Sequence, residues 1–399
     1  MGIFSRNKEK GKLALVFDIG SSSVGGALFW TESSKVPKIV FSIREPIVLE
    51  DTIEADRFLS LTIRSLETVV SRIHMAGIGA PEMIFCVLSS PWYVSQTRII
   101  KLEKNAPLLF TSKLADSLVQ KEKALFEEEY STKYLRSGAG ARLIELKNIK
   151  TMINGYETSN PLNQKGVDLE MTVFISVAGA QTLGKMEEAI KKYFHSKEIR
   201  FSSFTFSSFA VVRDMYANKE NFLLINIGGE VTDISMIKKN TLRESISFPL
   251  GLNFMIREVA SMSHSSLSEA KSLISLLKDG HATESVAKDL GSVIDKLKME
   301  WLDKLQDSLA HISNDISIPE TIYLTVDKEM ADFFTETIKT EQFNQYTLTE
   351  SKFNVVFLGT EVFHGMALFK ESVIRDPDLI IDSIYINRFL INSTKVKKV

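Results

Sequence analysis

The chain has 399 residues, with 48 Lys or Arg against 50 Asp or Glu, so its formal net charge is −2. This balance gives no excess of basic residues, so binding of nucleic acid through its phosphates is not expected. Apolar residues make up 44% of the chain, which is typical of a globular protein and not of a disordered one. At roughly 100–200 residues per domain, the length predicts about two to four folded units.

Cysteine content and hydropathy limit the compartment. The single cysteine, Cys86, cannot close an intrachain disulfide, which fits a reducing environment. No uncharged apolar run reaches the roughly 18 residues that a spanning helix needs. We therefore expect a soluble, cytoplasmic, multi-domain protein.

The first elements predict an α/β domain. A short apolar strand at residues 13–17 runs into the turn Asp18-Ile19-Gly20-Ser21-Ser22-Ser23, and the chain returns as a second apolar strand at 24–30. Two strands joined by a tight Gly/Ser turn form a hairpin. A helical pattern over 56–76 and a strand over 83–88 follow. This order indicates a mixed sheet covered by helices.

The next segments predict a small inserted unit and a return to the first domain. Strands near 94–102, 143–149 and 167–176, with a helix after Thr111, can build a separate α/β subdomain. A helix over 181–195 and a strand near 200–206 then resume the first domain. The phenylalanines there are expected to form core between two lobes: Phe201, Phe204, Phe206 and Phe209.

A second unit repeats the layout of the first about 208 residues later. An apolar strand from residue 222 enters the turn Asn226-Ile227-Gly228-Gly229-Glu230 and returns as an apolar strand through residue 237. Helices over 266–278 and 285–311, a strand over 321–325 and a helix over 328–340 follow, and the last 25 residues are expected to be irregular.

Both Gly-rich turns have the chemistry of an anion cradle. Successive backbone N–H groups and serine hydroxyls can hold phosphate oxygens, and glycine permits close approach of the backbone. A carboxylate at the end of the strand, Asp18, could hold hydrated Mg²⁺. The plain alternative is two tight hairpins without a ligand. Two such turns at corresponding places in two α/β units favour a nucleotide clamped between lobes.

The paired turns resemble the phosphate-1 and phosphate-2 loops of the actin-like ATPase superfamily. Within it, the pattern is most similar to the bacterial FtsA cell-division proteins and to PilM of type IV pili. Three further stretches support the resemblance: 156–170, like the end of the FtsA insert; 248–252, like the turn after phosphate-2; and 266–271, like the helix on the nucleotide side of the second lobe.

The resemblance implies a two-lobed actin-like (ribonuclease H-like) α/β fold with a small α/β subdomain inserted in the first lobe. The expected parts are the first lobe at 1–91 and 171–205, the insert at 92–170, the second lobe at 206–375 with a shortened helical subdomain at 261–318, and a C-terminal tail at 376–399. The six histidines lack metal-ligand spacing, so no direct metal site is expected.

The resemblance also implies ATP and Mg²⁺ as cofactors. The residues expected to bind the nucleotide phosphates are Asp18, Gly20, Ser21, Ser22, Ser23, Gly228, Gly229, Glu230 and Thr232. Asp18 and Asp233 would hold Mg²⁺ indirectly, through water. On the adenosine side, the corresponding positions are Lys271, Thr325 and Val326.

Two departures from the family pattern weaken the ATPase expectation. Asn226 stands where phosphate-2 loops normally begin with Asp, which removes a carboxylate from the neighbourhood of the metal. The strand at 322–325 runs into Val326 and Asp327 without the Gly-Gly pair that lets backbone approach the nucleotide. We expect at most a weak ATPase, or a scaffold that does not hydrolyse nucleotide.

Three functions remain open. The main expectation is an FtsA-like scaffold at the inner face of the membrane, which self-associates and links a tubulin-like division protein to it. The insert would be the surface for partners and self-association, and any membrane contact would be peripheral. An alternative is a PilM-like adaptor that binds the cytoplasmic peptide of a pilus inner-membrane protein. A third, of another class, is a small-molecule kinase or phosphatase on the same fold.

Overall fold

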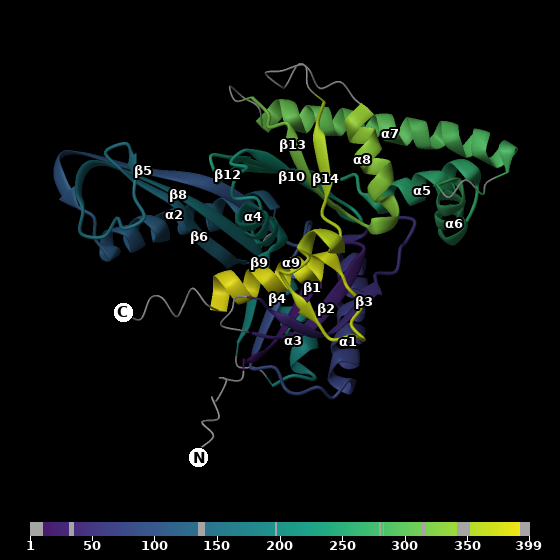
Figure 1. Ribbon diagram of the computed structural model, residues 1–399, viewed down its shortest axis with the longest axis horizontal. Helices are drawn as coiled ribbons and strands as arrows, with labels where there is room; N and C mark the ends of the chain where they lie inside the picture. The colour runs from purple at the N-terminus through teal and green to yellow at the C-terminus, as the bar shows by residue number, and fades with distance from the viewer. Residues whose placement is uncertain are drawn as a thin grey trace, which may run out of the picture.

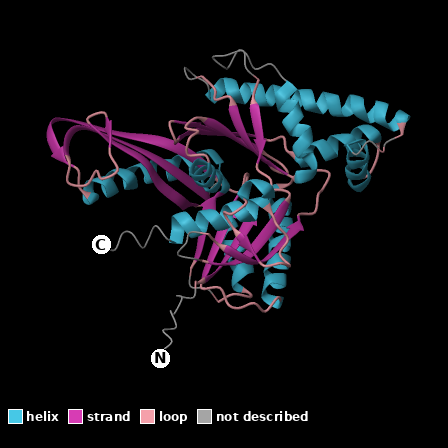
Figure 2. Cartoon of the chain, viewed as in Figure 1, coloured by secondary structure: helices cyan, strands magenta, loops and turns pink. Residues whose placement is uncertain are grey.

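The structure is a computed structural model. It describes residues 11–31, 36–134, 140–195, 198–278, 281, 283–312, 317–340 and 352–391. Three β-sheets organise these residues (Figures 1 and 2). Two of the sheets belong to two stacked lobes, and the third forms an arm at one side. Nowhere in these ranges is a helix both long and apolar enough to span a bilayer.

The first-lobe sheet has the strand order β15-β3-β2-β1-β4-β9. Its strands are β1 (Leu13–Ile19), β2 (Ser23–Trp30), β3 (Lys38–Pro46), β4 (Met83–Leu88), β9 (Ile199–Ser203) and β15 (Leu368–Phe369). The second-lobe sheet has the order β12-β11-β10-β13-β14. Its strands are β10 (Phe222–Ile227), β11 (Thr232–Lys238), β12 (Thr241–Phe248), β13 (Thr321–Val326) and β14 (Asn354–Phe357).

The predicted repeat is confirmed in the register of the two hairpins. β1 pairs antiparallel with β2 and parallel with β4, while β10 pairs antiparallel with β11 and parallel with β13. Asp18 lies opposite Gly25, and Asn226 lies opposite Asp233, so each pair repeats after 208 residues. Each apolar strand therefore delivers its Gly-rich turn to the same edge of its sheet.

Alternating side chains of the central strands divide the apolar core into layers. Ala14 and Val16 of β1, together with Leu224 of β10, face a shared core that contains α4 (Phe204–Met215) and α9 (Pro377–Tyr385). These two helices lie between the sheets (Figure 1). Because successive side chains on a strand point to opposite faces, the remaining residues of each strand serve a second core.

Helices cover the outer face of each lobe. α1 (Ala55–Met75) and α3 (Ala180–Lys191) pack on the first sheet, and α5 (Leu252–Ser263), α7 (Glu284–Ile312) and α8 (Ala331–Thr340) pack on the second. α6 (Leu267–Lys278) contacts α5 and α7. α6 and α7 lie within the range 261–318, where a helical subdomain is expected. Of the phenylalanines expected between the lobes, Phe204, Phe206 and Phe209 lie there, whereas Phe201 belongs to the first-lobe core.

The third sheet, with the order β5-β8-β6-β7, forms the inserted arm together with α2 (Ser112–Tyr134). Its strands are β5 (Val94–Leu109), β6 (Ala141–Ile153), β7 (Tyr156–Glu157) and β8 (Lys165–Gly179). The arm has its own small apolar core. The expected domain limit at residue 170 falls within β8, and that at residue 205 falls within α4.

The C-terminal region differs from expectation. Residues 377–391 are not irregular: they form α9 and the π-helical turn η3 (Ile386–Ile391). Asp376 caps α9 by accepting a hydrogen bond from the Leu379 amide. The helix is short, nine residues, and every residue from Leu379 to Tyr385 is buried, which left little pattern for the sequence to show. Residues 392–399 of the expected tail lie outside the described residues.

Candidate functional site

A cleft of about 310 Å³ lies between the lobes, at the edge where the two Gly-rich turns meet. It is lined by the turn after β1, the turn after β10, the ends of β13 and β14, and the residues that precede α9. The volume is at the lower end of the range for small-molecule pockets.

The same hydrogen bond closes both turns. The Gly20 amide donates to the carbonyl of Ser23 at 3.1 Å, and the Gly228 amide donates to the carbonyl of Val231 at 2.9 Å. The indole N–H of Trp92 also donates to the Gly20 carbonyl at 2.8 Å. The turns are therefore fixed by their own backbone and by a neighbouring side chain.

The second turn also caps α5. The amides of Leu252 and Asn253 donate to the carbonyls of Gly228 and Gly229 at 3.0 and 2.8 Å. Gly251 is required here, because a Cβ at this position would lie 2.4 Å from the Gly228 carbonyl oxygen. The segment 248–252 thus serves to bring the start of α5 against the phosphate-2-like turn.

Asp18 is buried and forms an ion pair with Arg44. A guanidinium N–H of Arg44 donates to the Asp18 carboxylate at 2.7 Å. Asp18, Gly25 and Arg44 lie side by side on β1, β2 and β3, and a Cβ at Gly25 would lie 2.9 Å from the guanidinium. Glycine in the middle strand therefore lets Arg44 reach across β2 to Asp18.

Arg44 also binds the segment that precedes α9. Its Nε donates to Asp376 at 2.5 Å, a second N–H donates to the same carboxylate at 3.0 Å, and a third donates to the Ser23 hydroxyl at 2.9 Å. Asp378 lies 3.7 Å from the guanidinium. Burial disfavours the charged form of Asp376, but the ion pair with Arg44 outweighs it and lowers its pKa. We name these four residues, Asp18, Arg44, Asp376 and Asp378, the Arg44 cluster.

The structure brings together seven of the residues predicted from sequence. The cleft is lined by Asp18, Gly20, Ser21, Ser22, Ser23, Gly228 and Val326. The other predicted residues are not among those that line it: Gly229, Glu230, Thr232, Asp233, Lys271 and Thr325. Whether any of them binds nucleotide stays a prediction.

Four of these residues have protein partners that explain their presence: Glu230, Thr232, Asp233 and Thr325. Glu230 is buried and accepts two hydrogen bonds from Arg257, at 2.8 and 2.6 Å. Thr232 donates to the Leu250 carbonyl. Asp233 accepts from Ser90 and Ser247, both at 2.6 Å, and burial raises its pKa. The Thr325 hydroxyl donates to the Asn226 side chain at 2.9 Å.

Sequence reasoning missed the residues that give the cleft its charge. Arg44 lies more than 300 positions before Asp376 and Asp378, so no local motif joins it to them. Residues 359–361 form another wall of the cleft. The sequence indicated this wall only weakly, through the apolar strand β14 that is followed by Gly359. The described lining holds five carboxylates, Asp18, Asp327, Glu361, Asp376 and Asp378, against three cations, Arg44, Lys328 and Arg375.

Comparison with solved structures tests the fold. The chain superposes on PilM from a PilM–PilN type IV pilus biogenesis complex with a TM-score of 0.58, at 13% identity, covering 94% of this chain and 96% of the other. The chain has the actin-like ATPase fold. A Bacteroides thetaiotaomicron protein with an actin-like ATPase fold and unknown function also matches, with a TM-score of 0.40 at 9% identity, covering 96% of this chain and 99% of that one. The ethanolamine utilization protein EutJ of Carboxydothermus hydrogenoformans matches with a TM-score of 0.39 at 9% identity, covering 94% and 88%.

Sequence comparisons add nothing to this assignment: no family model matches the chain, and no curated protein matches it. The match to PilM and the sheet topology confirm the two-lobed α/β fold predicted from the paired turns. At these identities the likeness concerns the fold alone.

The donors of the cleft do not fit Mg-ATP as they stand. Actin-like ATPase folds hold this cofactor with their two Gly-rich turns, but here Ser21 Oγ accepts a hydrogen bond from the Glu230 amide at 3.0 Å, so the turns bind each other. Arg44 is occupied by carboxylates, and Glu361 interacts electrostatically with Lys328 and Arg375. Within the described residues, no cluster of three or more metal-ligating side chains forms. A polyphosphate would enter a lining that is already acidic.

Proposed function

We propose that this protein is an actin-like adaptor that binds a cytoplasmic segment of an inner-membrane protein of type IV pilus assembly, as the PilM–PilN pair suggests. The observation that carries the proposal is the match to PilM over nearly the whole of both chains, which includes the inserted arm. On this reading the protein acts in the cytoplasm at the membrane, through its partner. Binding, and not catalysis, is its activity.

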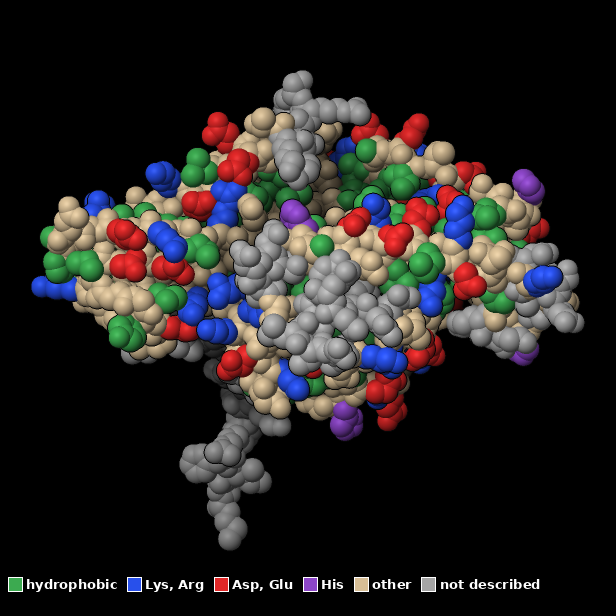
Figure 3. All heavy atoms as spheres, turned by 90° about the horizontal axis from the view of Figure 1, so that it is seen from above, with side chains coloured by type: hydrophobic (Ala, Val, Ile, Leu, Met, Phe, Trp, Pro, Cys, Tyr) green, Lys and Arg blue, Asp and Glu red, His purple; other side chains and the backbone are tan. Residues whose placement is uncertain are grey.

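The inserted arm is the surface that we propose for the partner. In the view from above, hydrophobic side chains are interspersed with charged ones at the arm's end of the molecule, at left in Figure 3. Leu108, Tyr156 and Val167 of the arm are 37%, 79% and 42% exposed. Exposed apolar side chains rimmed by polar ones are typical of protein-interaction sites.

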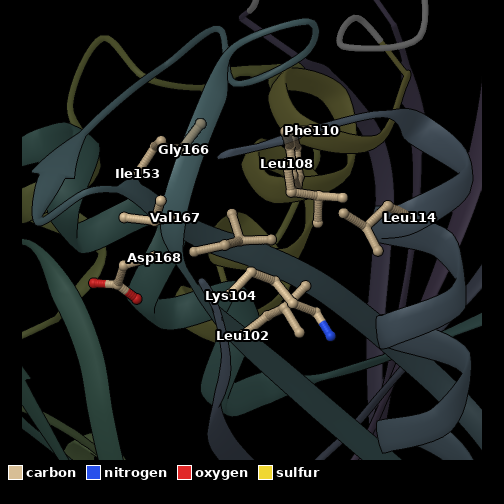
Figure 4. Close-up of a pocket in the computed structure, with 10 residues that line it drawn as sticks. Leu102, Lys104, Leu108, Phe110, Leu114, Ile153, Gly166, Val167 and Asp168 are labelled. Atoms are coloured by element: carbon tan, nitrogen blue, oxygen red, sulfur yellow. The ribbon is translucent and has the colours of Figure 1, made fainter. Parts of the chain in front are cut away.

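A shallow pocket on the arm gives this surface a centre (Figure 4). Its lining is mostly apolar, with Leu108 and Leu114 close together at one side and Val167 at the other. The charged ends of Lys104 and Asp168 lie on opposite sides of the apolar group. An apolar centre with charges at the rim is the arrangement that an amphipathic peptide segment requires.

The FtsA-like reading has less support. It adds self-association into filaments and a tubulin-like division partner, and the match to a pilus protein favours the alternative instead. The kinase or phosphatase reading requires phosphate transfer from ATP to an added sugar or polyol. The acidic cleft disfavours it, and we expect no transfer with purified protein.

The test is binding of a synthetic cytoplasmic peptide from the PilN-type protein of the same genome, measured by fluorescence anisotropy. We expect saturable binding that Leu108→Glu and Val167→Glu each weaken about tenfold or more, since a central apolar contact is worth about 1.4 kcal/mol or more. Met299→Glu, a change on α7 at a side chain 55% exposed, is the matched control and leaves affinity unchanged. Equal affinity in all four proteins would remove the arm from the proposal.

A further inference from the structure

Beside the Gly-rich turns, side-chain hydrogen bonds of the described residues join the lobes directly. Ser21 of the first lobe accepts from the Glu230 amide of the second at 3.0 Å. Ser90, after β4, donates to Asp233 on β11 at 2.6 Å. The Nε of Arg257, on α5, donates to the carbonyl of Glu50 at 2.8 Å. All three lie along the edge of the molecule where the Gly-rich turns meet.

The contact between the turns is close as well as polar. A Cβ added at Gly229 would lie 2.8 Å from the carbonyl carbon and oxygen of Ser21. The Glu230 amide, which a phosphate-2-type loop would offer to an anion, is committed to Ser21. No room for a phosphate group remains between Ser21 and this amide, because the hydrogen bond spans the whole gap.

The Arg44 cluster supplies opposite charges beside this contact. The Arg44 guanidinium lies against Asp18 and Ser23, where a hydrated metal ion was expected from the sequence. The Asp376 carboxylate pairs with it from the other side and also accepts the Leu379 amide at the start of α9. An anion at a helix N-terminus is favourable because the backbone N–H groups there lack partners within the helix.

We propose that this chain occupies its own nucleotide-type site: within the first lobe, Arg44 takes the place of the metal ion and Asp376 that of a phosphate anion, and across the lobes the Ser21–Glu230 hydrogen bond holds the turns together. The lobes then keep one arrangement with or without Mg-ATP. This goes beyond the adaptor function and does not depend on the partner. It gives the fold a fixed shape in place of a nucleotide-driven switch.

Electrostatics supports the substitution. Arg44 is paired with the carboxylates of Asp18 and Asp376, so its guanidinium is not available to a polyphosphate. To admit Mg-ATP, the cleft would have to break the Arg44–Asp376 pair and the Ser21–Glu230 contact. Breaking a largely buried ion pair leaves charges without partners, which is costly.

Distance measurement between spin labels tests the proposal on the whole protein. Ser60→Cys on α1 and Ser268→Cys on α6 place one label on each lobe, at exposed positions. The single native cysteine, Cys86, is buried and does not compete for label. We expect one narrow distance distribution, and we expect Mg-ATP to leave it unchanged. A concentration of about 1 mM suffices, because it lies at the upper end of typical KM values.

Variants separate the effect of the interlobe contacts from a general loss of stability. Ser21→Ala and, independently, Ser90→Ala, each of which removes a hydrogen bond between the lobes, are expected to lengthen and broaden the distribution. Arg72→Ala removes an exposed ion pair with Glu45 elsewhere in the first lobe and leaves the distribution unchanged. An unchanged distribution in both serine variants would overturn the role of the interlobe hydrogen bonds. Two results in the protein without these variants would overturn the proposal. One is a shift of the distance distribution on addition of Mg-ATP, and the other is a saturable heat of Mg-ATP binding in calorimetry.

Discussion

Glu145 of the inserted arm accepts a hydrogen bond at 2.5 Å from the hydroxyl of Tyr385, which lies 240 positions later in α9. Both side chains are buried. The same carboxylate accepts from the Ser203 hydroxyl at 2.8 Å, at the start of α4. One buried carboxylate therefore joins the arm, the first lobe and the C-terminal helix. The arm is fixed to the layer between the lobes, which is what an adaptor needs to transmit a bound partner's position.

Tyr385→Phe tests this junction. The change removes one donor and leaves Glu145 buried with fewer partners, so we expect a loss of about 1–3 kcal/mol in the free energy of unfolding. Urea unfolding measures it. Tyr156→Phe, at a side chain 79% exposed on the same arm, is the control and should change stability by less than about 0.5 kcal/mol. Equal stability of the two variants would show that the bond is not structural.

Arg257→Ala tests the role of Glu230. The resemblance implied that Glu230 binds phosphate, but its carboxylate is buried and accepts hydrogen bonds from Arg257 and from the side-chain amide of Asn253, the latter at 2.7 Å. Removing the guanidinium leaves that charge unpaired, and we expect a loss of about 3 kcal/mol or more. Arg57→Ala, which breaks an exposed pair with Glu50, should cost under about 1 kcal/mol. Thermal unfolding of both proteins decides between a structural and a ligand-binding Glu230.

Gly229→Ala tests the closeness of the two turns. A methyl group there would overlap the Ser21 carbonyl and Asn253, and we expect a loss of about 1–3 kcal/mol from the forced displacement. Gly184→Ala is the matched control, because a Cβ at that position in α3 meets nothing within 4 Å. There the helix should gain about 0.5–1 kcal/mol. A neutral Gly229→Ala would mean that the turns stand further apart.

Asp378 predicts a pH dependence. Burial, and then the nearby Asp18, raise its pKa from 3.8 to about 8, with Asp376 and Asp327 adding to the effect and Arg44 opposing it. Between these values the folded protein holds a proton that the unfolded chain has released, so the free energy of unfolding falls as pH rises from about 4 to 8. Because the side chain is 39% exposed, water reduces the size of the effect.

Asp378→Asn should therefore gain stability relative to the unaltered protein as pH rises from about 4 to about 8, and the two should converge at the acid end. Urea midpoints at several pH values measure it. Asp307→Asn, at a side chain 74% exposed on α7, is the control and should follow the unaltered protein. The idea fails if Asp378→Asn runs parallel to the unaltered protein over the whole range.

The sequence by itself determined the features that depend on neighbours in the chain. Strand-turn-strand patterning around Asp18 and Asn226 predicted both hairpins, and their repetition predicted two lobes that share a fold. Amphipathic spacing predicted α1, and apolar runs predicted β4 and β10. These predictions succeed because a period of two or of 3.6 residues is written locally and fixes which face of an element is buried.

Only the tertiary structure decided what the turns do. The partner of Asp18 is Arg44, which a glycine on the intervening strand makes reachable, and the partner of Arg44 is Asp376, which lies 332 positions further along the chain. The Glu230 amide donates to the Ser21 hydroxyl of the other turn. Pairing between charges from separate segments leaves no period and no spacing in the sequence, because only packing of α9 against the first sheet brings those segments together. The paired turns predicted a phosphate-binding site, and long-range packing places the charged side chains of Arg44 and Asp376 beside the first of these turns.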